Sequence, residues 1–342
     1  MNNLLPLIDK LEITSAQFQL PGKPVGREEA LEESEINKLI SYASILSLSE
    51  SPDEKNLSYE IITRLLEIRK GTDHKLIHSA EVILSRLGNF PGRQLLRERF
   101  QSDHNEIPSF LKLECLSREV ENSVFLHEDK AIHLTDFQYK FFTSLQEEKA
   151  LSISAPTSAG KSFVLGLNLI KKIREKESLC VVYIVPTRAL ITEVSIRIRD
   201  SLREYNLKNI IIRTAPFPVS KEITPESIIY VLTQERLINY LSGNFEEMPP
   251  ITSVVIDEAH EIQKGKRGIL LQSAIDYLLK KYPKAEILFA SPLIKNPGYF
   301  FSIFNILDNG KFFTETISPV SQNTLLVSEV YRKPKQLEVE LL

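Results

Sequence analysis

One short stretch, Ala155–Ser162, constrains the fold of this chain more than any other. It reads Ala-Pro-Thr-Ser-Ala-Gly-Lys-Ser, follows an apolar run at 151–154 and precedes apolar residues at helical spacing. A strand, a tight loop, Gly-Lys-Ser and a helix form a phosphate-binding loop, because backbone N–H groups converge at the helix start and carry partial positive charge. We therefore expect a nucleoside triphosphate to be held by Ala155, Pro156, Thr157, Ser158, Ala159, Gly160, Lys161 and Ser162.

Three residues of this loop have distinct predicted roles. Gly160 lets the backbone approach the phosphates, Lys161 reaches the β- and γ-phosphates, and Ser162 holds Mg²⁺. Ala155 stands where the usual G-x-x-x-x-G-K-[ST] pattern has its first glycine. The loop alone is thus an imperfect match, and a chance match is the alternative that downstream residues must exclude.

The composition is that of an ordinary globular protein, 42% hydrophobic and 25% charged over 342 residues. This length accommodates two or three domains of about 100–200 residues each. The two cysteines, Cys115 and Cys180, lie far apart in apolar contexts, as buried thiols of a reducing compartment do. No basic leader precedes an apolar run, and no apolar stretch approaches the ~18 residues of a membrane span. We therefore expect a cytoplasmic protein with no membrane partner.

The first part of the chain predicts an all-α domain over residues 1–130. Residues 1–27 contain several prolines and sustain no period, so we expect an irregular leader there. From residue 28 to about 134, apolar residues recur at i, i+3, i+4 and i+7, the spacing of one helix face. The N-terminal domain is therefore predicted to be a bundle of helices.

Charge distinguishes this helical part from the rest. Acidic side chains outnumber basic ones in residues 1–134, and basic ones are in slight excess afterwards. The acidic run at 28–35 suits a helix start, where the macrodipole favours carboxylates. Its two interpretations are a solvated helix face and a surface for a protein partner. His74 and His78 share a helix face, but with no third ligand nearby we interpret them as polar surface and not as a metal site.

Residues 131–342 predict an α/β domain. Short runs rich in Val and Ile alternate with amphipathic helices, and near-continuous apolar strands indicate a parallel sheet covered on both faces. Strands are expected at 151–155, 179–185, 209–213, 228–232, 252–256 and 285–290, and helices at 161–176, 188–204, 234–242, 269–281 and from about 297. In such a doubly wound sheet, ligands bind at the carboxyl ends of the strands.

Two carboxylates stand at one such strand end. Val254-Val255-Ile256 is followed by Asp257-Glu258-Ala259-His260. Asp257 can hold Mg²⁺ through water, because Mg²⁺ keeps several waters and uses few carboxylates. Glu258 can orient and deprotonate the water that attacks the γ-phosphate. An acidic helix cap is the alternative for Asp257 alone, but with the loop upstream the pair predicts ATP hydrolysis.

These motifs, taken together, resemble superfamily 2 helicases of the DEAD/DEAH type. Asp257–His260 resembles motif II and Ala155–Ser162 resembles motif I of that family. The other segments follow in the family's order and cover residues 134–342: Leu134–Gln138 resembles the Q motif, Pro186–Leu190 motif Ia, Leu232–Leu237 the T-P-E-R-L segment, and Arg267-Gly268 and Leu293–Pro297 the superkiller-like (exosome-helicase) branch. The helical leader with this loop also resembles antiphage-defence helicases of the Hachiman type.

The resemblance implies a RecA-like lobe and further site residues. Gln138 would recognise the adenine edge of ATP, and His260 would join Asp257, Glu258 and Lys161 in the catalytic set. Single-stranded nucleic acid, DNA or RNA, would be held by Thr187, Arg188, Thr233 and Arg236, through phosphate contacts that position a strand without reading its sequence. The alternative for each arginine is an ordinary surface residue at a helix start.

The resemblance also implies a partner for the lobe. In the family, ATP lies between two RecA-like lobes, and the second lobe supplies an arginine finger worth ~10³–10⁵ in rate. No second lobe is visible in this sequence, so we expect it in a longer chain or a partner, and we expect weak turnover from these residues alone.

One departure bears on activity. Motif III, Ser-Ala-Thr in the family, reads Ala290-Ser291-Pro292, and Pro292 removes both a hydroxyl and a backbone donor. Three alternatives to a helicase therefore stay open: a translocase that separates no strands, a nucleotide-gated module that recruits an effector such as a nuclease, and a nucleotide switch without nucleic-acid binding.

Overall fold

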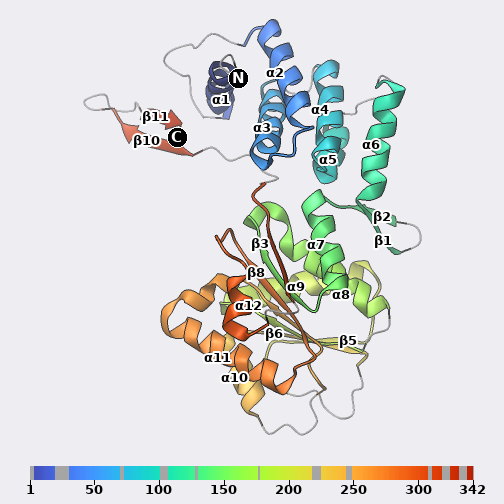
Figure 1. The fold of residues 1–342 in the computed structure, drawn as a ribbon, viewed down its shortest axis with the longest axis vertical. Helices are drawn as coiled ribbons and strands as arrows, with labels where there is room; N and C mark the ends of the chain where they lie inside the picture. The colour runs from blue at the N-terminus through green and yellow to red at the C-terminus, as the bar shows by residue number, and fades with distance from the viewer. Residues whose placement is uncertain are drawn as a thin grey trace. The chain divides into compact units, whose positions relative to one another are not determined.

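A computed structural model of the protein describes residues 4–19, 31–69, 73–100, 107–127, 130–175, 178–217, 225–243, 249–306, 310–317, 324–330 and 337–341. The chain divides into two compact units. The first comprises Met1–Val124, Ala131–Asp136 and Ile317–Leu342, and the second Phe125–Lys130 and Phe137–Thr316. The first unit is mainly helical, and the second is an α/β unit (Figure 1).

The helices of the first unit are α1 (Leu5–Gln19), α2 (Glu33–Leu46), α3 (Pro52–Arg69), α4 (His74–Arg86), α5 (Phe90–Phe100) and α6 (Ser109–Glu121). Helices α1 to α5 pack around one apolar core, and Cys115 of α6 lies in a separate small cluster. Leu11, Leu39, Leu65 and Leu76 are fully buried in this core. Because they lie on different helices at helical spacing, the apolar stripes read from the sequence meet one another here.

The prediction of an irregular leader is wrong for Leu5–Gln19, which forms helix α1. Pro6 lies in the first turn, where the missing N–H would have no intrahelical partner, so it does not break the helix. Ile8, Leu11 and Ser15 are buried along one face. The remaining residues of the predicted leader, 20–27, lie outside the described residues.

The prediction of helix up to about residue 134 is also wrong at its end. The strands β1 (Ser123–His127) and β2 (Lys130–His133) pair as a two-stranded sheet. Val124 and Leu126 are buried while Phe125 between them is exposed, which is the period of a strand and not of a helix.

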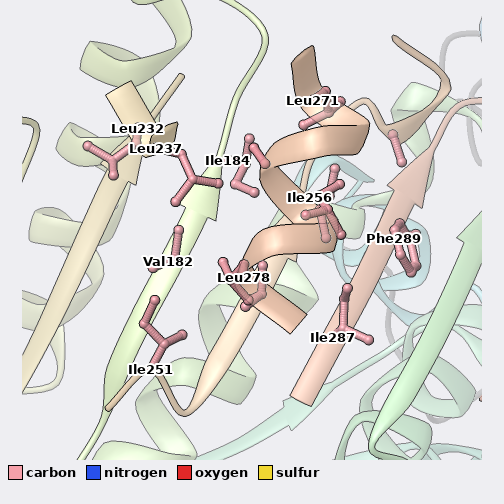
Figure 2. Packing of buried hydrophobic residues seen from close by; sticks show 14 of the residues in the cluster. Val182, Ile184, Leu232, Leu237, Ile251, Ile256, Leu271, Leu278, Ile287 and Phe289 are labelled. Carbon is pink, nitrogen blue, oxygen red and sulfur yellow. The ribbon is translucent and has the colours of Figure 1, made fainter. Parts of the chain in front are cut away.

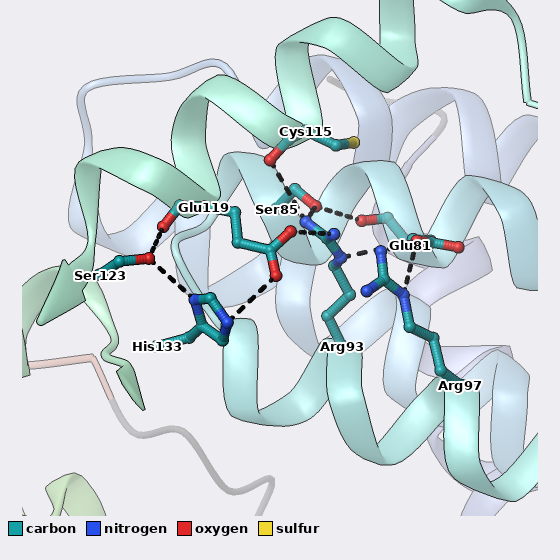
Figure 3. A network of polar contacts seen from close by, with 8 residues as sticks. All are labelled: Glu81, Ser85, Arg93, Arg97, Cys115, Glu119, Ser123 and His133. Atoms are coloured by element: carbon teal, nitrogen blue, oxygen red, sulfur yellow. Dashed lines mark hydrogen bonds and ion pairs between the residues drawn. The ribbon is translucent and has the colours of Figure 1, made fainter. Parts of the chain in front are cut away.

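A buried ion network joins α4, α5 and α6 (Figure 3). The guanidinium of Arg93 lies 2.6 Å from Glu119 and 3.5 Å from Glu81, and the side chains of Arg93 and Glu81 are each 2% exposed. Arg97 also contacts Glu81, and His133 lies 3.5 Å from Glu119. Buried charges are tolerated when they are paired and hydrogen-bonded in this way.

The second unit is built on a seven-stranded sheet. Its order is β5-β6-β4-β7-β8-β3-β9, and every adjacent pair is parallel. The strands are β3 (Ala150–Ser154), β4 (Cys180–Ile184), β5 (Ile210–Arg213), β6 (Ser227–Leu232), β7 (Ser253–Ile256), β8 (Glu286–Ser291) and β9 (Gly310–Thr314). The predicted α/β class with a doubly wound parallel sheet is confirmed.

Helices cover both faces of this sheet. From β3 to β5 the chain moves toward one edge, and from β6 to β9 it moves back. Right-handed crossovers therefore place helices α8 (Lys161–Arg174) and α9 (Arg188–Glu204) on one face, and α10 (Gln234–Ser242), α11 (Gly265–Lys281) and α12 (Tyr299–Phe304) on the other.

The core between the sheet and the second helical layer is apolar. Val182, Ile256 and Phe289 from three strands pack against Leu271 and Leu278 of α11 (Figure 2). Helix α7 (Asp136–Glu147) precedes β3.

Two strand regions depart from the predicted pattern. The edge strand β9 was not predicted, because Gly310–Thr314 mixes polar and aromatic residues without a sustained apolar run. The strands β10 (Leu325–Glu329) and β11 (Leu337–Leu341) form a separate antiparallel pair and belong to the first unit. The predicted lobe boundary, 131–342, therefore differs from that of the compact α/β unit. Among the described helices, none is long and apolar enough to cross a membrane.

Candidate functional site

The candidate site lies on the carboxyl-terminal side of the sheet, where five parallel strands end. Because the strands are parallel, the segments that follow them meet at this edge. They are the loop after β3, the Pro186–Arg188 segment after β4, Thr233 after β6, Asp257 after β7 and the Ser291–Pro292 step at the end of β8.

The loop after β3 has the backbone of a phosphate cradle. Thr157–Ala159 forms one 3₁₀ turn, and Gly160 follows with φ 80° and ψ 25°, in the left-handed region. A Cβ at Gly160 would lie only 2.5 Å from Gln138 Nε2. Both the positive φ and the close approach require glycine here. The loop thus leads directly into the N-terminus of α8, the arrangement that concentrates backbone N–H donors.

Lys161 begins α8 and turns its side chain back over the loop. Its ammonium group donates to the carbonyl oxygens of Ala155, at 2.7 Å, and Pro156, at 2.9 Å. The side chain is buried, and burial lowers the pKa of Lys161, while Glu258 and Asp257 act in the opposite direction. The loop lysine and the two carboxylates after β7 therefore belong to one electrostatic site.

Gln138, predicted to recognise adenine, lies on α7 beside the loop. Its Nε2 donates to the carbonyl oxygen of Ala159 at 3.2 Å, and its side chain is nearly buried. The amide therefore supports the loop backbone directly, and its oxygen end provides an acceptor for an exocyclic amine. Adenine recognition by Gln138 stays a prediction.

Asp257 is held on both carboxylate oxygens. Its Oδ1 accepts from the backbone N–H of Glu258 at 3.1 Å, and its Oδ2 accepts from the hydroxyl of Tyr183 at 3.1 Å. The backbone N–H of Asp257 donates to Ile184 O at 3.0 Å and continues the ladder between β4 and β7. Each oxygen keeps a second lone pair, which can accept from a water.

Glu258 has an unusual backbone. Its φ is 54° and its ψ 44°, a left-handed conformation that costs a non-glycine residue about 1 kcal/mol or more. Burial raises the pKa of Glu258, and the charge of Asp257 raises this pKa further. His260 and Lys161 act in the opposite direction and lower it. A carboxylate with a raised pKa accepts a proton more readily, as a general base does.

His260 lies next to this carboxylate. Its Nδ1 is 3.3 Å from Glu258 Oε2, and its Nε2 is 3.7 Å from Glu261 Oε1. The structure thus brings the predicted catalytic residues together at the carboxyl ends of the strands; they are Lys161, Asp257, Glu258 and His260. Their catalytic roles stay predictions.

The donor set fits a magnesium–nucleotide complex. Ser162 and Asp257 offer one hydroxyl and one carboxylate, hard oxygen ligands of the kind that Mg²⁺ prefers together with water and phosphate oxygens. Among the described residues no cluster of three or more His, Cys, Asp or Glu side chains could hold a metal.

The motif III segment is bonded to the loop strand. The hydroxyl of Ser291 donates to Ile153 O at 3.3 Å, and the N–H of Ala155 donates to Ser291 O at 3.2 Å. Ser154 Oγ accepts from the N–H of Ile294 at 2.8 Å. The segment around Pro292 is therefore tied to the phosphate loop even though the usual threonine is missing.

A cleft of about 510 Å³ lies beyond the ends of β4 and β6. Three of the predicted nucleic-acid residues line it, namely Arg188, Thr233 and Arg236. The other lining residues are Pro216, Glu235, Asn239 and Arg267. Three guanidinium groups against one carboxylate make the cleft basic, which suits a phosphate backbone.

The cleft residues are anchored by their helices. Thr187 and Thr233 precede the first residues of α9 and α10, and Thr187 Oγ1 accepts from Leu190 N–H at 3.4 Å. Arg236 donates to the carbonyl of Thr214, and Arg188 is exposed. Thr187 does not line the cleft, so the structure groups only three of the four predicted residues there.

Two contributors were missed as site residues. Arg267 donates to the carbonyl of Pro186 and lies 3.4 Å from Glu235. The sequence marked Arg267 only as part of a resemblance. Tyr183 lies within an apolar strand, and the signal that could have identified it is that a buried tyrosine hydroxyl needs a hydrogen-bond partner.

Comparison with known proteins identifies the type of domain. Residues 135–293 match the family model described as DEAD/DEAH box helicase. The ATP-dependent RNA helicase mtr4 of Schizosaccharomyces pombe is 26% identical over 167 residues, 49% of this chain and 14% of its own length. The Hachiman protein HamB of Bacillus cereus is 25% identical over 146 residues, 41% of this chain and 13% of its own.

Further similarities extend to DNA helicases. The ATP-dependent DNA helicase Hel308 of Thermoplasma volcanium is 24% identical over 176 residues, 52% of this chain and 26% of its own. Among solved structures, the DEAD-box helicase Mss116 bound to ssRNA and UDP-BeF covers 55% of this chain and 40% of that chain, with 18% identity and a TM-score of 0.42. The chain thus spans between 13% and 26% of the length of the three curated relatives named. Within it, residues 135–293 form a superfamily 2 helicase domain of the DEAD/DEAH box type.

Proposed function

We propose that the α/β unit binds ATP with Mg²⁺ and is the first RecA-like lobe of a motor that moves along single-stranded nucleic acid. One observation carries the proposal: the loop with Lys161 follows β3 and the pair Asp257 and Glu258 follows β7, so both lie at the carboxyl ends of parallel strands in one sheet. Phosphoryl transfer needs positioning and charge neutralisation more than covalent chemistry, and these residues supply both.

Each residue has a proposed role in this site. The backbone of 155–160 and the ammonium of Lys161 bind the phosphates, and Gln138 meets the adenine edge. Ser162 and Asp257 hold Mg²⁺, which neutralises charge on the phosphates when bound. Glu258 orients the attacking water and takes its proton, and His260 holds the Glu258 carboxylate, 3.3 Å away.

The cleft lined by Arg188, Thr233, Arg236 and Arg267 is the proposed path of the strand. Its basic side chains and helix starts can contact phosphates without reading bases, so we propose a substrate of either DNA or RNA. Relatives named as RNA helicases and as DNA helicases support this breadth.

Hydrolysis is proposed to need a second RecA-like lobe, in the same chain or in a partner. The test is ATP hydrolysis, with and without single-stranded oligonucleotides, by a preparation that contains this chain and the proposed second lobe. Glu258→Gln is expected to keep ATP bound and to abolish turnover, because the amide cannot accept the proton. Wild-type turnover by this variant, or no stimulation by either poly(dT) or poly(U), would contradict the proposal.

A second candidate function is ATP-driven translocation without strand separation. Pro292 favours it, because the motif III segment lacks the hydroxyl and the N–H that the family uses there. A strand-displacement assay run beside the hydrolysis assay separates the two. Displacement of a duplex at a rate matched to ATP turnover would exclude the translocase.

A third candidate is a nucleotide-gated module in which the acidic helical residues 1–130 recruit an effector such as a nuclease; one relative of the chain is named as a Hachiman protein. Co-purification of the intact chain with a nuclease, lost when the acidic run at 28–35 is neutralised, is the expected result. No association under any nucleotide condition would exclude it.

A further inference from the structure

Tyr183 is a polar side chain in an otherwise apolar strand. It is the fourth residue of β4, which reads Cys-Val-Val-Tyr-Ile, and it is 6% exposed. Its neighbours Val182 and Ile184 point into the core shared with α10 and α11. Because side chains alternate along a strand, Tyr183 points to the opposite face, on which α8 begins with Lys161 and Ser162.

The hydroxyl of Tyr183 reaches one of the predicted magnesium ligands. It donates to Asp257 Oδ2 at 3.1 Å. The backbone N–H of Glu258 donates to the other carboxylate oxygen, Oδ1, at 3.1 Å. Asp257 therefore accepts one hydrogen bond on each oxygen.

Together the two donors fix the orientation of the carboxylate. The tyrosine hydroxyl holds Oδ2 and the N–H of Glu258 holds Oδ1, so the plane of the Asp257 carboxylate is set.

The fixed plane matters for a cation. Each oxygen of Asp257 keeps a second lone pair, and the two donors determine where these lone pairs point. Without the tyrosine hydroxyl, Asp257 keeps the N–H of Glu258 on Oδ1 but loses the donor on Oδ2, so the carboxylate is held less firmly.

We propose that Tyr183 is a positioning residue that aligns Asp257 for the magnesium ion of the bound nucleotide. This inference rests on the proposed nucleotide site and deepens it. Partners that orient metal ligands are typically worth 10–100-fold in metal affinity or activity.

Tyr183→Phe in the 342-residue chain is the test, with the fluorescent nucleotide mant-ADP as the probe. Binding is measured in EDTA and during a Mg²⁺ titration at fixed mant-ADP. The expected result is that the variant binds mant-ADP like the wild type in EDTA but needs about 10-fold more Mg²⁺ to reach half of the magnesium-dependent signal.

The matched control is Tyr230→Phe. Tyr230 lies on β6, the strand next to β4, is fully buried and donates to Phe217 O at 3.4 Å, away from the carboxylates. It loses a buried hydroxyl of the same kind, and its Mg²⁺ midpoint should match that of the wild type. Tyr183→4-aminophenylalanine keeps an N–H donor and should return the Mg²⁺ midpoint to the wild-type value. This second variant also tests the proposal if Tyr183→Phe folds poorly.

The outcomes separate the two proposals. A wild-type Mg²⁺ midpoint in Tyr183→Phe, or an equal loss of affinity with and without Mg²⁺, contradicts the role of Tyr183 and leaves the nucleotide site standing. No binding of mant-ADP by the wild-type chain under either condition contradicts the nucleotide site itself.

Discussion

The ammonium nitrogen of Lys161 lies 2.7 Å from the carbonyl oxygen of Ala155, six residues earlier in the same loop. A second donor of Lys161 is used by Pro156, so one of its three N–H groups remains for a ligand. The loop therefore positions its lysine through its own backbone. The contribution of Ala155 is its backbone carbonyl, which any residue at this position would supply. This explains why alanine is acceptable where the general pattern has glycine.

Gly160→Ala should damage the loop at its other end. The new Cβ would meet Gln138 Nε2 at 2.5 Å, in a backbone conformation with φ 80°. We expect mant-ADP affinity to fall at least ~10-fold, since about 1–2 kcal/mol of backbone strain alone approaches that factor.

The control for this change is Gly166→Ala on helix α8. There the nearest atom to a new Cβ is Ser201 Oγ at 4.0 Å, so the substitution should leave nucleotide binding intact and stabilise the helix by ~0.5–1 kcal/mol. Equal binding by both alanine variants would show that Gly160 has no special role.

Arg188→Gln should weaken the binding of single-stranded nucleic acid regardless of its sequence. Removing one phosphate contact is expected to reduce the slope of log affinity against log salt by about 0.7 for a single strand. Fluorescence anisotropy with a labelled oligonucleotide at several salt concentrations measures this.

Arg203→Gln is the matched control, because Arg203 lies at the other end of the same helix and its side chain is 79% exposed. Its salt dependence should equal that of the wild type. If both variants lose the same affinity, the arginine effect is general surface charge and the cleft is not the strand path.

Arg93→Met should loosen the helical unit. It leaves Glu81 and Glu119 without their shared guanidinium, and breaking a buried ion pair in this way typically costs 3–5 kcal/mol. Hydrogen exchange in α4, α5 and α6 should accelerate by a corresponding factor.

Arg69→Met provides the comparison. Its partner Glu33 is 65% exposed, so this pair should contribute no more than ~1 kcal/mol. Unchanged exchange in Arg93→Met would mean that the buried network adds nothing to the stability of the unit.

Much of the α/β unit could be predicted from the sequence because local and global signals agree there. The strand at Cys180–Ile184 is an unbroken apolar run, and Thr187 and Gly160 mark helix starts by their own chemistry. The site at the carboxyl ends of the strands followed from the parallel sheet alone. The sequence pattern therefore predicted that the site lies on the carboxyl-terminal side of the sheet.

The errors have equally local causes. In α1, Pro6 lies in the first turn, where its missing N–H costs nothing, so this proline does not exclude a helix. In β1, only three residues alternate in burial, too few to outweigh the helical pattern before them. The contacts of Tyr183 with Asp257 and of Arg267 with Pro186 join residues more than seventy positions apart, and no local pattern encodes such pairings.

The most direct test of the nucleotide site is equilibrium binding of mant-ADP with Mg²⁺ to the 342-residue chain and to Lys161→Ala, with Lys171→Ala as control. Lys171 lies on the same helix, is partly exposed and pairs only loosely with Glu175, at 3.8 Å. The account predicts saturable binding by the wild type and by Lys171→Ala, and at least a ~10-fold loss in Lys161→Ala, because a charged hydrogen bond of about 1.5–3 kcal/mol is removed. Equal affinity in all three proteins, or no binding in any, would contradict it.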